Sequence, residues 1–212
     1  MKLLISENEV KMMKKLLGLL SAVCAMALCL CAAVCLMSVS ASAAEHSNHP
    51  ICGKTHIDIG DHTGTCKNVT WTAWDGTSEI SYDADTKTAY VYLKDNATRS
   101  RALKVSNGQT LNLCLNGKTL SRTYTVIEVT GGATLNICDC QGGGGITISS
   151  GCVIEVDTRD DVNGNAVFGT ATLNLYGGKL STDDTDDSGT VKLYNNDGNE
   201  PRTVAGFNMY GG

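Results

Sequence analysis

The chain has 212 residues, and its 17 basic against 22 acidic side chains give a formal charge of −5 at pH 7. Nucleic acids and anionic membrane surfaces select basic proteins, so this balance excludes both as expected partners. The 23 glycines, the two prolines and the lack of sustained helical spacing after residue 43 indicate a chain of strands and turns.

Residues 1–43 are predicted to be a cleaved signal peptide. Three lysines precede an uncharged stretch at 16–37, and Ala-Ser-Ala at 41–43 is typical of a cleavage site. Cleavage leaves 13 basic and 20 acidic side chains, a formal charge near −7. We therefore expect a secreted or cell-surface protein with no membrane segment after cleavage. An uncleaved anchor is the alternative, because the apolar run is long enough to span a bilayer.

Residues 44–70 form a segment that contains all four histidines and two of the six cysteines that follow the signal. Imidazole and thiolate groups in close pairs suit tetrahedral zinc, and His46 and His56 are spare or substitute ligands. The predicted zinc ligands are His49, Cys52, His62 and Cys66. One alternative is a disulfide between Cys52 and Cys66 with the histidines in solvent, and another is neither bond nor metal.

Residues 71–88 are predicted to be a linker and N-terminal cap. Trp71 and Trp74 are expected to cover the open end of the following repeat. Alternatively, their rings form a sugar-stacking site.

Residues 89–212 contain three strand types in constant order. Each alternates apolar with polar residues, as strands do, and the closest copies lie 24 residues apart. The first type occupies 102–105, 126–129, 153–156 and 190–193. The second type occupies 110–113, 134–137, 172–175 and 206–209. The third type occupies 117–121, 144–149 and 177–181.

Interchangeable strands with variable connections predict an all-β fold, a right-handed parallel β-helix with three faces. A β-sandwich is the alternative, but antiparallel hairpins would not require such repeats. Residues 157–171 and 181–189 are expected to be loops at corners of the coil. The chain stops in the middle of a turn of the coil, so we expect the β-helix to be truncated at its C-terminal end.

The alternation also assigns the two faces of the second strand type. Leu111, Leu113, Leu135, Ile137, Leu173, Leu175, Phe207 and Met209 are predicted to point inward. Asn112, Asn136, Asn174 and Asn208 form an outward column, followed by a second column of Cys114, Cys138, Tyr176 and Tyr210. Amides beside aromatic rings suit a glycan-binding surface, with Asn174, Tyr176, Asn208 and Tyr210 as its candidates. The alternative is simple packing between turns.

Charged residues give no catalytic assignment. Lys104, Glu128, Glu155 and Lys192 occupy equivalent positions, which favours stacked opposite charges over an acid–base pair. The acids of 157–161 and 181–189 are either calcium ligands or solvated loop residues. No histidine follows residue 62, so a histidine base in the coil is excluded.

The segments "HPICG", "VTWTAWDG", "AYVYLKDNAT", "LNLCLNGKTL" and "LNICDCQGGGGITIS" give the chain a specific resemblance. Over about residues 46–150 it resembles exported surface proteins of anaerobic bacteria, in which a His/Cys-rich segment precedes a pectin-lyase-like right-handed parallel β-helix. The resemblance implies a bacterial surface protein and carries no established activity.

We therefore expect an exported, non-enzymatic and adhesin-like scaffold. Its expected partners are extracellular glycans or a host or cell-wall surface, and zinc is its expected cofactor, if any. A polysaccharide lyase or glycoside hydrolase of the same fold is the alternative.

Overall fold

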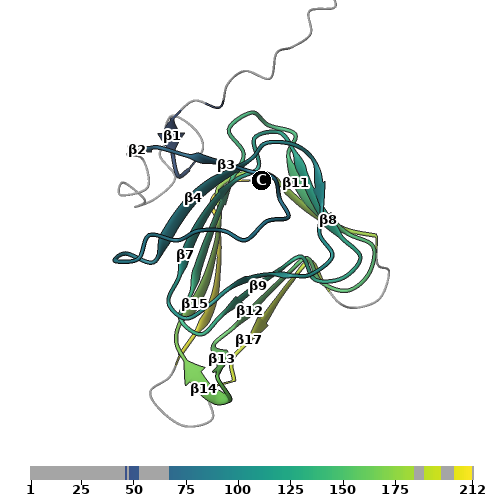
Figure 1. The fold of residues 1–212 in the computed structure, drawn as a ribbon. Coiled ribbons are helices and arrows are strands. Elements are labelled where there is room, and N and C mark those ends of the chain that lie inside the picture. The colour runs from purple at the N-terminus through teal and green to yellow at the C-terminus, as the bar shows by residue number, and fades with distance from the viewer. Residues whose placement is uncertain (1–45, 47, 53–66, 184–188, 197–202, 212) are drawn as a thin grey trace, which may run out of the picture. The chain divides into compact units, whose positions relative to one another are not determined.

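The computed structural model describes residues 46, 48–52, 67–183, 189–196 and 203–211, all within the compact unit formed by 46–212 (Figure 1). The predicted signal peptide, His56, His62 and Cys66 lie outside the described residues. The described part of the chain forms strands and no helix, and it therefore holds no helix able to cross a membrane.

Three parallel sheets make up the repeat, and Figure 1 shows them side by side around a shared interior. The first sheet contains β3 (Thr72–Trp74), β4 (Thr88–Leu93), β7 (Thr110–Cys114), β10 (Thr134–Cys138), β15 (Ala171–Leu175) and β18 (Ala205–Met209). The second contains β5 (Ala97–Thr98), β8 (Thr119–Arg122), β11 (Gly145–Ile148) and β16 (Lys179–Thr182). The third contains β6 (Leu103–Val105), β9 (Ile127–Thr130), β12 (Ile154–Asp157) and β17 (Val191–Tyr194).

Two antiparallel pairs accompany these sheets. One joins β1 (His49–Pro50) to β2 (Asn68–Val69), and the other joins β13 (Arg159–Val162) to β14 (Asn165–Phe168). The second pair lies inside the predicted loop 157–171, so that loop is a hairpin over much of its length.

The register of the strands confirms the predicted repeat. Leu111 pairs with Leu135, Leu135 with Leu173, and Leu173 with Phe207, and all of these pairings are parallel. The first-type and third-type strands pair in the same way with their counterparts. The three sheets therefore lack the antiparallel pairs of a β-sandwich. Their arrangement is compatible with a parallel β-helix, in which we call one strand from each sheet a rung.

The inward residues form one continuous core. Leu111, Leu113, Leu135, Ile137 and Leu173 are fully or almost fully buried, as predicted. Phe207 and Met209 were predicted to be buried too, but 36 % and 68 % of their surfaces are exposed. They belong to β18, which is an edge strand of the described sheet, so no strand covers that side of them.

The repeat begins earlier in the chain than residue 89. Strand β3 lies in the segment predicted as a linker or cap, yet it pairs with β4 in parallel. Trp74 packs in the core, and Trp71 is buried on the opposite face of the sheet. Since both rings are covered by protein, the alternative of a sugar-stacking site at these tryptophans is wrong.

The asparagine column is a hydrogen-bonded ladder. The side-chain amide of Asn136 donates to Oδ1 of Asn112 at 2.7 Å, and Asn174 donates to Asn136 at 2.8 Å. Asn208 continues the ladder to Asn174 at 2.9 Å. Asn112 and Asn136 point away from the core, as predicted, but they are buried on the outer face of the sheet, where the ladder and the bond from Nδ2 of Asn112 to the carbonyl oxygen of Ala89 satisfy their polar atoms.

Candidate metal centre

A cluster of sulfur and aromatic side chains lies on the outer face of the first sheet. Cys114 and Cys138 end β7 and β10 and pair in register, because the alternation that turns Leu113 and Ile137 inward turns the next residue outward. Both thiols are buried, in contact with a group that includes Trp71, Tyr90 and Tyr92. The outer face of this sheet is therefore a second packed layer.

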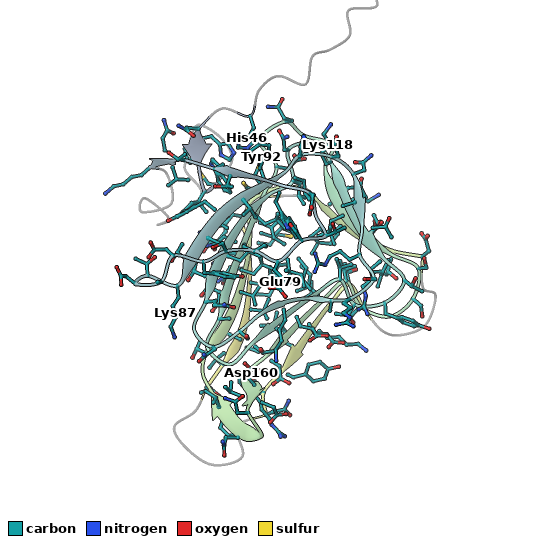
Figure 2. All side chains as sticks on the ribbon, in the orientation of Figure 1. His46, Glu79, Lys87, Tyr92, Lys118 and Asp160 are labelled. Atoms are coloured by element: carbon teal, nitrogen blue, oxygen red, sulfur yellow. The ribbon has the colours of Figure 1, made fainter. Side chains whose placement is uncertain are left out.

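The start of the described chain is fixed on this layer by β1. His49 pairs with Val69 of β2, and the indole Nε1 of Trp71 donates a hydrogen bond of 2.9 Å to the carbonyl oxygen of His49. The His49 ring stacks on Trp71 with 4.5 Å between centroids. The His46 ring stacks on Tyr92 at 3.9 Å, and Figure 2 shows these two side chains together.

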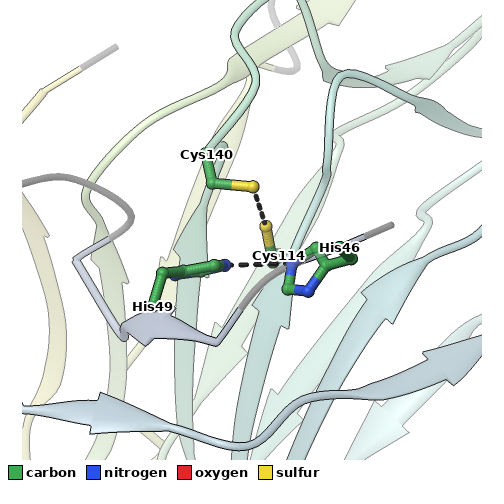
Figure 3. A group of neighbouring side chains, drawn as sticks. All are labelled: His46, His49, Cys114 and Cys140. Atoms are coloured by element: carbon green, nitrogen blue, oxygen red, sulfur yellow. Dashed lines mark hydrogen bonds between the residues drawn. The ribbon is translucent and has the colours of Figure 1, made fainter. Parts of the chain in front are cut away.

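Two histidines and two cysteines converge at this point. The ligand atoms of His46, His49, Cys114 and Cys140 all lie within 4.8 Å of one another (Figure 3). The Nε2 atoms of the histidines are 3.0 Å apart, and the two sulfurs are 3.4 Å apart. Around a tetrahedral zinc ion these separations would be about 3.3 Å and about 3.8 Å. The remaining separations reach up to 4.8 Å, whereas a nitrogen and a sulfur on tetrahedral zinc would be about 3.6 Å apart. The four side chains could therefore hold a metal ion if these two pairs widened slightly and the histidines and cysteines moved closer together.

His49 can offer a lone pair to a metal, while the 3.0 Å contact between the two Nε2 atoms needs a proton on His46, which a bound metal would displace. Nδ1 of His49 lies 2.6 Å from the carbonyl oxygen of Pro50, and a proton donated there leaves Nε2 with its lone pair. Burial, together with the neighbouring His49, lowers the pKa of His46 from 6.5 to about 4. Its imidazole is therefore neutral at neutral pH.

The surroundings of the two thiols keep them protonated at neutral pH. A hydrogen bond with Cys138 contributes most to raising the pKa of Cys114 to about 12. The hydrogen bond to Cys114, followed by burial, also raises the pKa of Cys140. A bound divalent cation would stabilise both thiolates and release their protons, so binding should be coupled to deprotonation.

The centre only partly matches the ligands predicted from sequence. His49 belongs to it, and so does His46, a predicted substitute. Cys52 is described but is not one of the four, while His62 and Cys66 lie outside the described residues. Cys114 and Cys140 were not predicted as ligands. The sequence did indicate that Cys114 and Cys138 lie in one column, and Cys140 follows Cys138 by two residues. It did not indicate that the histidines would cover this column.

The charged column stacks as predicted, with Lys104, Glu128, Glu155 and Lys192 in successive register. However, Lys104 forms its ion pair with Asp160 of the hairpin, at 2.5 Å. Other acids of 157–161 are also engaged: Asp157 accepts hydrogen bonds from Asn196, and Asp161 pairs with Arg159. Among the described residues, the His/Cys centre is the one group with the spacing of a metal site.

Fold and site together define an all-β protein of stacked parallel strands with a candidate His/Cys metal centre. No protein-family model matches the chain, and no curated protein and no solved structure matches it. Its function must therefore be inferred from its own residues.

Proposed function

We propose that the chain is an exported, non-enzymatic scaffold of bacterial origin, a right-handed parallel β-helix whose N-terminal segment is held on the first sheet by zinc. The zinc ligands are His46, His49, Cys114 and Cys140. The convergence of these four ligand atoms is the observation that carries the proposal. Parallel strands joined by crossovers are right-handed in about 98 % of cases, which supports the proposed hand.

Zinc is favoured by the donor set, because two imidazoles and two thiolates in tetrahedral reach are typical of this ion. Four protein ligands leave no coordination position for a substrate, as in structural sites. The N-terminal segment is paired with the rest of the chain only through the short strands β1 and β2 and contacts such as those with Trp71. The ion would join this segment to β7 and to the turn after β10. Its proposed role is therefore to fix the start of the β-helix.

The signal-like residues 1–43 support export, and the acidic balance of the chain suits an extracellular setting. The proposed outer role is adhesin-like contact with glycans through Asn174, Tyr176, Asn208 and Tyr210. Tyr176 and Tyr210 are stacked with 4.9 Å between ring centroids and 8° between their planes, and Asn208 is exposed beside them. Aromatic rings and exposed side-chain amides are groups that can contact a bound sugar.

Metal analysis of the purified protein tests this proposal. We expect about one equivalent of zinc per chain, and we expect Cys140→Ser to weaken zinc binding at least tenfold, because one of four ligands is lost. Cys152→Ser is the matched control, since Cys152 is a buried thiol that is hydrogen-bonded to Glu155 and lies outside the centre. Equal zinc affinities of Cys140→Ser and the wild type, measured by competition with a chelator, would contradict the proposal.

A further inference from the structure

A polar cleft of about 570 Å³ lies beside the first rungs, between residues 77–82 and 98–109. Its size is within the usual range for small-ligand sites. Hydroxyl groups dominate its wall, which includes Thr77, Ser78, Thr98, Ser100 and Ser106. Neither the metal centre nor the proposed tyrosine surface uses this cleft.

The cleft is cationic on an acidic protein. Arg99, Arg101 and Lys104 line it, against the single acid Glu79, which is labelled in Figure 2. Lys104 is already paired with Asp160, so the two arginines carry the remaining positive charge. The carboxylate of the nearby Asp75 is occupied by the backbone N–H groups of Thr77 and Ser78.

Arg99 is held in position for a ligand. Its Nη1 donates to the carbonyl oxygen of Gly76 at 2.6 Å, and its Nε donates to that of Arg101 at 3.1 Å. Its guanidinium also lies over the Trp74 ring, 5.4 Å from the centroid. These two bonds use two of the five N–H donors of the guanidinium. The other three can donate to the oxygens of a carboxylate or sulfate group.

A buried polar atom gives an independent signal. The hydroxyl of Tyr82, which lines the cleft, is buried with no hydrogen-bond partner among the described residues. Burial raises the pKa of Tyr82 to about 12, so the hydroxyl keeps its proton. Since such groups almost always have partners, this donor calls for one that the described residues do not supply.

We infer that this cleft binds an acidic oligosaccharide. Its carboxylate or sulfate groups pair with Arg99 and Arg101, and its hydroxyls meet Tyr82 and the serine and threonine side chains. A nucleotide fits less well, because the only aromatic side chain lining the cleft is the partly buried Tyr82. The inference rests on the proposed glycan contact for its ligand class, but it assigns a different surface.

Calorimetry at low salt with the purified protein tests the cleft. The probes are an oligouronate, a sulfated oligosaccharide and a neutral oligosaccharide of equal length, together with inorganic sulfate. We expect one or both acidic oligosaccharides to bind more tightly than the neutral probe and inorganic sulfate. Comparing the oligouronate with the sulfated oligosaccharide shows whether the cleft prefers carboxylate or sulfate groups. Arg101→Gln should weaken that binding about tenfold, as expected for the loss of a charged hydrogen bond.

Two further variants sharpen the test. Lys94→Gln makes the same charge change on an exposed residue outside the cleft and should leave affinity unchanged. Tyr82→Phe removes only the hydroxyl and should weaken binding several-fold without loss of stability.

An unaltered affinity in Arg101→Gln, or equal binding of the neutral probe or inorganic sulfate, would overturn the inference. If Tyr176→Ala and Tyr210→Ala abolish binding while Arg101→Gln does not, the proposed glycan contact stands and the cleft falls. If no oligosaccharide binds, both fall.

Discussion

Removal of zinc by a chelator should lower the Tm of the purified protein by about 10 °C. A ligand present at about a thousand times its Kd stabilises the folded state by about 4 kcal/mol, and a domain of this size shifts by a few degrees per kcal/mol. The effect should be large because the ion joins parts of the chain far apart in sequence, His46 and His49 on one side and Cys114 and Cys140 on the other. Differential scanning calorimetry with and without chelator measures it.

Two variants control this result. Cys114→Ser should melt at a temperature near that of the chelated wild type and should no longer respond to chelator. Cys152→Ser should keep the full response, because its thiol lies outside the centre. A wild-type Tm that does not change when zinc is removed would contradict a structural role for the ion.

Leu135→Ala should destabilise the protein by about 3 kcal/mol, as is typical for loss of a fully buried leucine. Leu135 lies on β10, with Leu111 and Leu173 as its register partners on the two neighbouring strands. Strands on both sides limit how far the structure can close the cavity. Urea unfolding followed by circular dichroism measures the change in the free energy of unfolding.

Met209→Ala is the matched control for the core. Met209 is also an inward position of the repeat, in register with Leu175 of β15, but 68 % of its surface is exposed. Its replacement should change the free energy of unfolding by less than about 0.5 kcal/mol. Equal effects of the two substitutions would mean that Leu135 is not at the centre of a stacked core.

The stacked strands could be predicted from the sequence because their signal is local. Thr-Leu-Asn followed by Leu or Ile recurs at 110–113, 134–137 and 172–175, and a period of two places the leucines of each copy on one face. Strands with nearly identical sequences are expected to occupy equivalent positions in the fold, with equivalent neighbours. The parallel register of Leu111, Leu135 and Leu173 follows directly.

The metal centre could not be predicted in full, because its ligands meet only through tertiary structure. Spacing along the chain favoured Cys52 as the partner of His49. In the structure, the contacts of His49 with Trp71 bring it to the sheet, where Cys114 and Cys140 lie about one repeat apart. No local pattern shows which face of a sheet a preceding segment will cover.

Burial at the edges of the repeat was also beyond the sequence pattern. Alternation assigns a direction to Phe207 and Met209, but their exposure depends on whether another strand lies over them. Similarly, the hairpin of β13 and β14 carries Asp160 to Lys104, 56 residues earlier in the chain. Such pairings depend on the path of a connection rather than on strand alternation.

X-ray absorption at the zinc edge of the purified protein tests the central claim most directly. The predicted result is a four-coordinate ion with two sulfur ligands at about 2.3 Å and two nitrogen ligands at about 2.0 Å. A zinc shell of oxygen and nitrogen alone, or protein purified in zinc that retains none, would contradict the proposed centre.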